Sequence, residues 1–419
     1  MAESVVHLSS VVGSPLLDCS GERLGRVEDV IARLDTGDEL PSVTGLKARI
    51  GGRELFVPAD RIARLEPQDA RTSTTMLDLA RFERRPGEVL LRADVLGRSM
   101  IDVNTARLVK AREVELACDG GTWRVAGIDP ALGAGIRRFL PRRFRGHERD
   151  HAAFVPWSQI EPFVGHVPTS RLRLAPRRLA RLHPAQIADL VEAASHEEGE
   201  EILQAVGHDK ELEADVFEEL DDEHQVEFLK ERPDQEVAAV LARMAGDDAA
   251  DLLLELDQDR RIPVLNLMPA AKQLKIKRLL GYNPSTAGGL MNPDFASLQA
   301  DATVVQALAR VRASELPPGQ LLAIWVIDEQ EKLVGGVFAF ELIQADGDAS
   351  VASLIETRVP AISPETELPE VARLMADFNL LAMPVIDADG KPIGVISFDD
   401  VLELLIPEEW RRRAGEARG

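Results

Sequence analysis

Aromatic side chains are scarce in this sequence and make up only 4% of its 419 residues. Their scarcity argues against base-stacking nucleic-acid modules and aromatic ligand cages, because both are built from such rings. The two cysteines, Cys19 and Cys118, are far apart and show no Cys-x-x-Cys spacing. Neither a zinc site nor a disulfide framework is indicated, which fits a reducing compartment.

Long apolar runs are also missing. The longest, residues 321–327 and 333–340, end well short of the roughly eighteen residues that a spanning helix needs. The N-terminus lacks a basic segment followed by an apolar run, so no secretory signal is indicated. We therefore expect no transmembrane segment and a soluble, cytoplasmic protein.

Catalytic motifs are absent as well. The sequence contains no Gly-x-Ser-x-Gly, Walker A or His-Glu-x-x-His motif, and its eight histidines do not pair with a nucleophile at motif spacing. The glycine-rich run at residues 133–135 does not follow a Rossmann strand. We expect that the protein is not an enzyme.

Charge is abundant and unevenly placed within a net charge of −22. Residues 192–259 hold twenty-four acids against four basic residues, whereas residues 137–181 hold eleven arginines against three acids. The acidic block attracts cations and makes nucleic acid an unfavourable partner, or else it forms ordinary solvated helix faces. The arginines around 137–149 dock on RNA or lipid headgroups, or are solvated or paired with the acidic block.

Two β-rich segments come first. Residues 1–68 and 88–168 each consist of short alternating runs broken by turn residues, which is typical of small barrels. The first closes on Leu55-Phe56-Val57-Pro58 and the second on Phe154-Val155-Pro156-Trp157. Both resemble the PRC-barrel family, whose members serve as interaction modules in ribosome maturation factors and photosynthetic reaction centres.

The apolar period changes from two to about 3.6 at residue 172, which predicts helices up to residue 281. Apolar anchors are followed by apolar pairs eight and nine positions later, as at Leu220 with Phe228 and Leu229. Asp or Pro just past an anchor suits a helix start. The repeat predicts a helical solenoid whose stacked units share one core.

A tandem repeat follows. Trp325-Val326-Ile327-Asp328 with Gly335 matches Pro384-Val385-Ile386-Asp387 with Gly394, at the same spacing. Amphipathic helices precede both hairpins. This pattern resembles a pair of CBS domains, at residues 282–348 and 349–406. The expected fold class is thus multidomain α+β, with two small barrels, an acidic helical solenoid and an α/β CBS pair.

The segment between solenoid and tandem repeat ends in Ala287-Gly288-Gly289-Leu290-Met291. With its two flanking regions, this segment resembles the cytosolic part of MgtE-type magnesium channels, in which a short Ala-Gly-x-Leu-Met segment joins an acidic helical N domain to the first CBS domain. The resemblance covers residues 172–406. The family's membrane domain would follow directly, but this chain ends at Gly419, so we expect a form without it.

The resemblance implies Mg²⁺ sites between the helical domain and the CBS pair. Mg²⁺ takes oxygen ligands and keeps several waters, so spaced carboxylates suffice to hold it. Carried over position by position, the implied ligands are carboxylates and one backbone carbonyl: Asp215, Asp247, Asp251, Glu367, the carbonyl of Ala376, Asp400 and Glu403. Pro369 and Asn379 stand where the family has acids, and Arg411-Arg412-Arg413 partly replace its C-terminal acids. We therefore expect fewer ions and lower affinity, or ordinary surface acids.

CBS pairs also bind adenine nucleotides such as ATP through a Ser/Thr-x-x-Asp element. Ser397 and Asp400 form that element in the second repeat. The first repeat has Ala339-Phe340-Glu341 there, without the hydroxyl and one residue short. The resemblance thus implies one nucleotide site at most, which shares Asp400 with the metal hypothesis.

The leading hypothesis is a Mg²⁺-sensing regulator or adaptor that acts on magnesium transport or homeostasis through a partner. The barrels would hold a membrane transporter or another protein, peripheral to the membrane, and the CBS pair would form a homodimer. Alternatives are an adenine-nucleotide-responsive CBS module and a ribosome- or RNA-associated adaptor, the latter by fold analogy alone.

Overall fold

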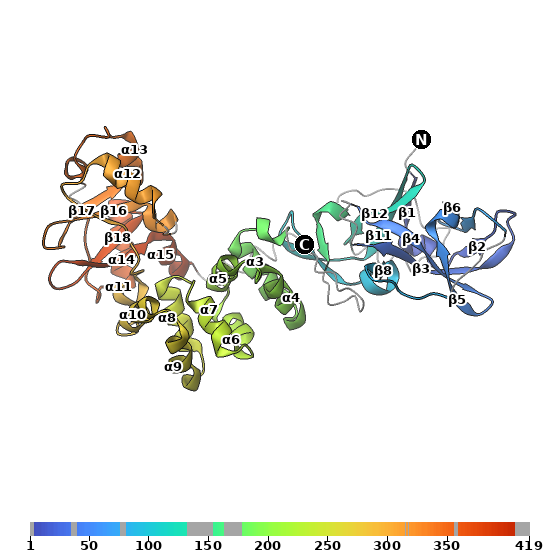
Figure 1. Ribbon diagram of the computed structural model, residues 1–419, viewed down its shortest axis with the longest axis horizontal. Coiled ribbons are helices and arrows are strands. Elements are labelled where there is room, and N and C mark those ends of the chain that lie inside the picture. The colour runs from blue at the N-terminus through green and yellow to red at the C-terminus, as the bar shows by residue number, and fades with distance from the viewer. Residues whose placement is uncertain are drawn as a thin grey trace. The chain divides into compact units, whose positions relative to one another are not determined.

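The computed structural model describes residues 4–34, 40–75, 81–131, 154–162, 178–314, 316, 318–355 and 359–406 (Figure 1). The chain forms two compact units, Met1–Val216 and Phe217–Gly419, which are treated separately below. The glycine run 133–135, the arginine-rich stretch 137–149, residue 172 and the C-terminal arginines 411–413 lie outside the described residues.

The first part of the N-terminal unit is β-rich. Its first segment contains β1 (Ser4–His7), α1 (Leu8–Val11), β2 (Pro15–Leu17), β3 (Arg23–Arg33), β4 (Ser42–Ile50), β5 (Arg53–Pro58), η1 (Ala59–Arg61), β6 (Ile62–Leu65) and β7 (Ala70–Thr72). The second contains β8 (Glu88–Leu90), the π-helical turn η2 (Leu91–Val95), β9 (Ser99–Asp102), β10 (Arg107–Lys110), β11 (Glu113–Asp119), β12 (Thr122–Asp129), β13 (Val155–Pro156), η4 (Trp157–Gln159) and β14 (Ile160–Pro162).

The two segments repeat each other at close contacts. A Cβ on Gly45 would meet the Val57 carbonyl oxygen at 2.4 Å, and a Cβ on Gly127 would meet that of Val155 at 2.2 Å. A phenylalanine ring, Phe56 or Phe154, lies against each glycine. Both glycines are needed because a neighbouring strand approaches too closely for any side chain.

The sequence predicts two barrels, and the structure joins strands from both segments into one 11-stranded sheet, while β9, β10 and β14 form a second sheet. Strand β1 of the first segment pairs with β11 of the second, and β8 of the second pairs with β3 of the first. Each segment therefore completes the other, and one hydrophobic core runs through both. Unpaired strand edges leave backbone groups unsatisfied, and the exchange of first strands removes two such edges.

Two buried carboxylates bind the segments together in the same reciprocal way. Asp29 accepts hydrogen bonds from the backbone N–H of Arg92 at 2.8 Å and of Ala93 at 3.1 Å, which holds η2 on β3. Glu113 accepts one from the N–H of Ser9 at 3.0 Å, which holds α1 on β11. Each carboxylate satisfies N–H groups that begin a short turn in the other segment.

Asp29 gives this junction a pH dependence. Burial raises its pKa to about 6, although the N–H groups of Arg92, Val30 and Ala93 oppose the shift. A carboxyl whose folded pKa lies above its unfolded pKa favours folding when protonated, so its contribution is lost as pH rises through about 6. Relative to Asp29→Asn, the wild type should lose about 1–2 kcal/mol of unfolding free energy between about pH 5 and pH 8.

Urea unfolding followed by tryptophan fluorescence measures this difference. Asp60→Asn is the control because the Asp60 side chain is 76% exposed. If the stability difference between wild type and Asp29→Asn does not change with pH, the buried carboxyl does not titrate as described.

The helical region starts in the N-terminal unit and continues into the C-terminal unit, with the division inside α5. Its helices are α3 (Pro184–Ala193), α4 (His196–Val206), α5 (Lys210–Glu219), α6 (Asp222–Lys230), α7 (Asp234–Leu241), α8 (Gly246–Glu255), α9 (Gln258–Leu267) and α10 (Ala270–Leu279), after the short turn η5 (Leu179–Arg181). The repeat read from the sequence is buried: Leu220 is 4% exposed, Phe228 2% and Leu229 0%.

The rest of the C-terminal unit is a tandem α/β repeat. Its elements are α11 (Ala287–Leu290), β15 (Ser297–Gln299), α12 (Val304–Arg312), η6 (Pro318–Leu321), β16 (Ala323–Ile327), β17 (Leu333–Phe338), α13 (Ala339–Gln344), η7 (Val351–Leu354), α14 (Leu368–Phe378), β18 (Ala382–Ile386), β19 (Pro392–Ser397) and α15 (Phe398–Leu405). Hairpins β16–β17 and β18–β19 have the same register and the same irregularity one residue before the end of their first strands. The expected mixed α+β class is confirmed.

Candidate functional site

A group of carboxylates lies where α8 meets α15 in the C-terminal unit. Asp247 and Asp248 begin α8, and Asp400 and Glu403 lie on α15 (Figure 1). Asp247 interacts electrostatically with Asp400, and Asp248 interacts with both Asp400 and Glu403. Glu218, near the end of α5, adds a fifth charge that acts on Asp247 and Asp248. We call these five residues the acidic cluster.

Residue Asn292 connects the two helices that carry the cluster. Its side-chain amide donates a hydrogen bond to Asp247 Oδ1 at 3.2 Å, and its backbone pairs with Val395 on β19, the strand that leads into α15. Gly246 allows the close approach, since a Cβ there would lie 2.9 Å from Pro293. The junction segment after α10 therefore sets the position of α8 against the second repeat.

Burial and neighbouring carboxylates disfavour the charged form of the acids in the cluster. Burial, followed by the neighbouring Asp400 carboxylate, raises the pKa of Asp247 to about 7. Burial also raises the pKa of Asp400, opposed by the hydrogen bond from the Ser397 hydroxyl. Backbone N–H groups at the start of α8 partly offset the penalty, as expected for anions at a helix N-terminus. A bound cation would relieve the remaining repulsion.

A lysine lies on the edge of the cluster. Lys272 on α10 donates a hydrogen bond to the carbonyl oxygen of Met244, just before α8. Burial lowers the pKa of Lys272, while the charges of Asp294, Asp247 and Glu218 oppose that shift. Its ammonium group therefore compensates part of the cluster's charge.

The other residues expected as ligands lie elsewhere. Asp251 is on α8, but partial burial, together with the charges of Asp222 and Glu255, raises its pKa to about 6. Asp215 belongs to the N-terminal unit, where partial burial and then Glu211 raise its pKa. The structure thus groups Asp247, Asp400 and Glu403 and does not group Asp215 or Asp251 with them.

Two expected ligands lie on α14. Glu367 is its N-cap residue, and the carbonyl of Ala376 accepts a hydrogen bond from the N–H of Asn379 at 3.4 Å. Asn379 ends the helix in the left-handed conformation, with φ of 53°. Asparagine tolerates that conformation well, which gives a local reason for its presence where an acid was expected.

The donor set suits a hard cation. Carboxylate oxygens are the ligands that Mg²⁺ prefers, and Mg²⁺ commonly keeps waters between itself and the protein. Within the described residues, no three carboxylates of the acidic cluster present oxygens within 4.8 Å of one another. An ion at this cluster would therefore have to be held partly through its own waters. Sequence reasoning missed Asp248, Glu218 and Asn292. No motif points to Glu218 or Asn292, and Asp248 was passed over beside Asp247.

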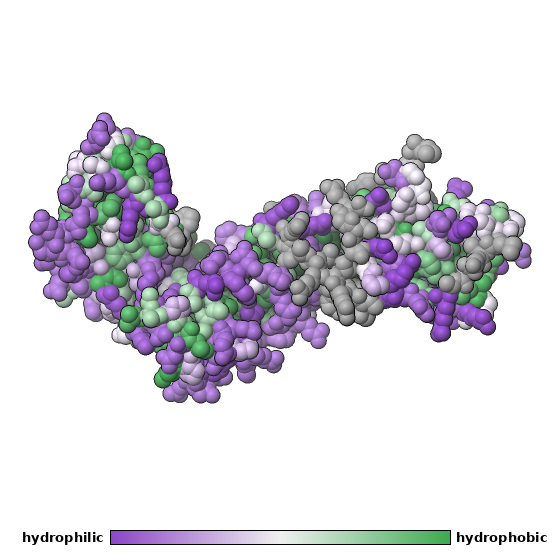
Figure 2. Space-filling model, viewed as in Figure 1, coloured by the Kyte–Doolittle hydropathy of each residue, from purple (hydrophilic) through white to green (hydrophobic). Residues whose placement is uncertain are grey.

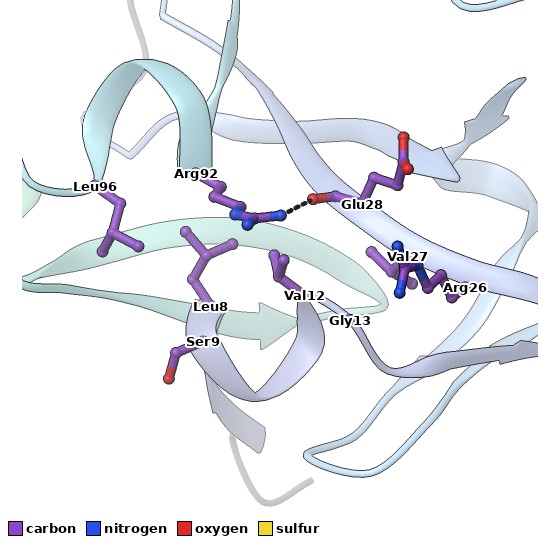
Figure 3. Close-up of a pocket in the computed structure, with 9 residues that line it drawn as sticks. All are labelled: Leu8, Ser9, Val12, Gly13, Arg26, Val27, Glu28, Arg92 and Leu96. Atoms are coloured by element: carbon purple, nitrogen blue, oxygen red, sulfur yellow. Dashed lines mark hydrogen bonds between the residues drawn. The ribbon is translucent and has the colours of Figure 1, made fainter. Parts of the chain in front are cut away.

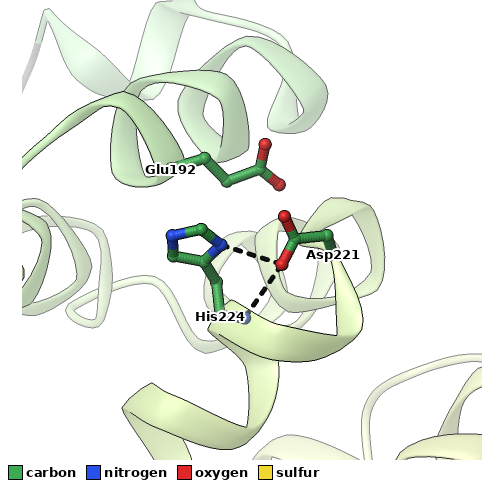
Figure 4. A group of neighbouring side chains, drawn as sticks. All are labelled: Glu192, Asp221 and His224. Atoms are coloured by element: carbon green, nitrogen blue, oxygen red, sulfur yellow. Dashed lines mark hydrogen bonds and ion pairs between the residues drawn. The ribbon is translucent and has the colours of Figure 1, made fainter. Parts of the chain in front are cut away.

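Another acid–histidine contact in the helical region has a structural role. Asp221 accepts a hydrogen bond from the backbone N–H of His224 at 2.9 Å, and its Oδ1 lies 2.8 Å from His224 Nδ1 (Figure 4). Asp221 is the N-cap of α6, so the pair satisfies a helix start.

The element expected to bind nucleotide forms a helix cap. Ser397 is the N-cap of α15, and its hydroxyl donates a hydrogen bond to Asp400. The matching hairpin registers align Phe338 with Ser397 and Glu341 with Asp400. The first repeat is therefore not one residue short, which corrects the sequence-based expectation. It does lack the hydroxyl, because a phenylalanine occupies the cap position.

Family models match three parts of the chain. Residues 3–72 match the PRC-barrel domain, residues 182–285 the MgtE intracellular N domain and residues 351–407 the CBS domain. The chain joins a PRC barrel to an MgtE N domain and a CBS domain. The acidic cluster accordingly draws Glu218, Asp247 and Asp248 from the MgtE N domain and the other two acids from the CBS domain.

Three curated proteins that match part of this chain are magnesium transporters. The magnesium transporter MgtE of Thermus thermophilus is 29% identical over 200 residues, 46% of this chain and 44% of the transporter. MgtE of Enterococcus faecalis is 32% identical over 134 residues, 32% of this chain and 30% of the transporter. The chain thus spans less than half the length of the curated MgtE relatives it matches.

Two solved structures each match a little over half of the chain. The soluble part of a magnesium transporter is 26% identical with a TM-score of 0.50, covering 55% of this chain and 90% of that structure. The cytosolic domain of the Mg²⁺ channel MgtE in complex with ATP is 28% identical with a TM-score of 0.50, covering 55% and 93%. In the part of this chain that the structure describes, no helix has the length and apolarity to cross a bilayer.

Repulsion in the acidic cluster predicts a stabilising substitution. Asp247→Asn keeps the side-chain volume and an oxygen that accepts from Asn292, and it removes one charge. In EDTA at about pH 8, the free energy of unfolding of the variant should be about 1–2 kcal/mol higher than that of the wild type. Calorimetry checks this, with the exposed Asp301→Asn as control. Equal or lower stability of Asp247→Asn would show that the carboxylate is not under strain.

Proposed function

We propose that this protein is a Mg²⁺-responsive regulatory adaptor that acts on magnesium transport or homeostasis through a partner. The observation that carries the proposal is the acidic cluster, in which burial and the charge of Asp400 on α15 raise the pKa values of Asp247 and Asp248 on α8. Like charges that a fold brings together from two domains are a suitable site for a divalent cation.

The mechanism follows from this repulsion. Without the ion, the carboxylates of α8 and α15 favour separation of the two helices, whereas Asn292 and the packing at Gly246 oppose it. A hydrated Mg²⁺ between Asp247, Asp248 and Asp400, with Glu403 at the rim, binds the closed arrangement alone. It therefore shifts the population toward that arrangement by its difference in affinity. Asp215, Asp251, Glu367 and Ala376 stay candidates for further, weaker ions.

The adaptor role also implies a function for the barrel and for the tandem repeat. The PRC barrel would hold the partner, a membrane transporter or another protein. The tandem repeat would form a homodimer, since large apolar side chains are exposed on its helices: Val305 is 56% exposed, Ile343 74%, Phe378 48% and Leu405 50%. Figure 2 shows hydrophobic side chains among hydrophilic ones over the part that carries α12 and α13.

A magnesium titration tests the sensor. Millimolar Mg²⁺ should reduce the radius of gyration in a saturable way and slow hydrogen exchange in α8 and α15. Asp247→Asn should raise the midpoint at least about tenfold, because the ion loses a charged ligand. Asp251→Asn should shift it less, since Asp251 lies beside Asp222 and Glu255 instead.

Small-angle scattering and hydrogen-exchange mass spectrometry give the two readouts, and light scattering gives the mass in the same samples. Sodium chloride at matched ionic strength is the control, because screening reduces repulsion without saturating. Identical titrations of wild type, Asp247→Asn and Asp301→Asn would refute the sensor.

An adenine-nucleotide-responsive module is the second candidate. It is supported by the Ser397–Asp400 arrangement at the start of α15 and by similarity to a structure of the MgtE cytosolic domain with ATP. Calorimetric titration with ATP should show one site per chain, weakened about tenfold by Asp400→Asn because the ribose loses an anionic acceptor. Glu341→Gln is the matched control in the first repeat. Equal loss in both variants, or two sites, would contradict the proposal.

A further inference from the structure

An open pocket lies where the two β-rich segments meet (Figure 3). Its cavity volume is about 310 Å³, and its walls come from α1, β3 and η2. The apolar surface is formed by Leu8 and Val27, which are fully buried, and by Val12 and Leu96, which are partly exposed. Neither segment encloses the pocket alone, because η2 belongs to the second segment and the rest to the first.

Two arginines line the pocket beside this apolar surface. Arg26 on β3 and Arg92 on η2 are exposed, and neither has an acidic partner among the described residues. The guanidinium of Arg92 donates a long hydrogen bond of 3.5 Å, from Nη1 to the carbonyl oxygen of Glu28. The carboxylate of Glu28 forms an ion pair with Arg49, which also pairs with Glu54. The acid in the pocket wall is thus neutralised and the two arginines keep their charge.

The backbone of Arg92 is held in place before any ligand binds. Asp29, 4% exposed, accepts hydrogen bonds from the backbone N–H groups of Arg92 and Ala93, so η2 cannot move without breaking a buried contact. A guanidinium on a held backbone loses less freedom when it binds a carboxylate, and it binds in a bidentate way. The pocket therefore combines a preformed apolar surface with two guanidinium groups at its rim.

We propose that this pocket binds an acidic peptide segment of the partner protein, with an aliphatic side chain on the apolar surface and flanking carboxylates on Arg26 and Arg92. Charge complementarity favours this occupant, because two unpaired cations persist here in a chain of net charge −22. The pocket is open at Gly13, Arg26 and Arg92, which suits a chain passing over it. The inference rests on the proposed adaptor role and names the chemistry of its partner.

Fluorescence anisotropy on the full chain tests this, with the rhodamine-labelled peptide Glu-Asp-Leu-Leu-Glu-Asp as probe. The neutral peptide Gln-Asn-Leu-Leu-Gln-Asn should bind at least about tenfold more weakly. Arg26→Gln and Arg92→Gln should each weaken the acidic probe about fivefold. Arg23→Gln, on the same strand but outside the pocket, should leave binding unchanged.

One variant is expected to bind more tightly, which misfolding does not produce. Glu28→Gln removes the acid in the wall and frees Arg49, so affinity for the acidic probe should rise about threefold. Absence of binding, equal binding of the neutral peptide, or equal loss in Arg23→Gln and Arg92→Gln would overturn the proposal. Competition by acetate or inorganic phosphate as strong as by unlabelled peptide would also overturn it, in favour of a simple anion site.

The magnesium titration separates this proposal from the sensor. Arg92→Gln should keep the wild-type response to Mg²⁺, because Arg92 lies in the N-terminal unit and the acidic cluster in the C-terminal unit. If the wild type responds to Mg²⁺ but does not bind the acidic peptide, only the pocket proposal is contradicted. An absent magnesium response with intact peptide binding contradicts only the sensor.

Discussion

Repulsion between carboxylates held at the start of α8 and on α15 is the interaction on which the proposed behaviour of this protein depends. The fold brings them together with two features that carry no charge: the amide of Asn292 and the bare backbone at Gly246. The closed arrangement therefore stores unfavourable electrostatic energy that a cation can release. Lys272 compensates part of this repulsion, and the remainder is left for a cation to relieve.

Buried carboxylates have a different outcome in the barrel. Asp29 and Glu113 each accept backbone N–H hydrogen bonds from the opposite segment, which hold a short turn of that segment in place. Asp94 affects the pKa of Asp29 less than burial and three backbone N–H groups do, and the result is a fixed junction. The same residue type thus gives rigidity where donors meet it and responsiveness where other acids do.

This contrast suggests a division of labour within one chain. The N-terminal unit presents a preformed pocket, in which Arg92, with its backbone bonded to Asp29, lies beside an apolar surface. The C-terminal unit carries the elements that respond to an ion. Each function can then be removed by a substitution that leaves the other intact, since Arg92 and Asp247 belong to different units.

Much of the architecture was predictable from the sequence, because periodicity is a local property. The anchors around Leu220, the twin hairpins of the tandem repeat and the β-rich segments all follow from apolar spacing. The acids Asp247 and Asp400 could be named from their motifs. Strand exchange between the barrels could not, because pairing of β1 with β11 joins residues more than a hundred positions apart.

Tertiary structure alone decided which acids share a site. Asp247 and Asp251 lie four residues apart on one helix, yet Asp247 faces Asp400 while Asp251 faces Asp222 and Glu255. Sequence spacing places both on α8 but says nothing of the neighbouring elements. The field at a carboxylate comes from every charge packed around it, and those neighbours are fixed only when the chain has folded.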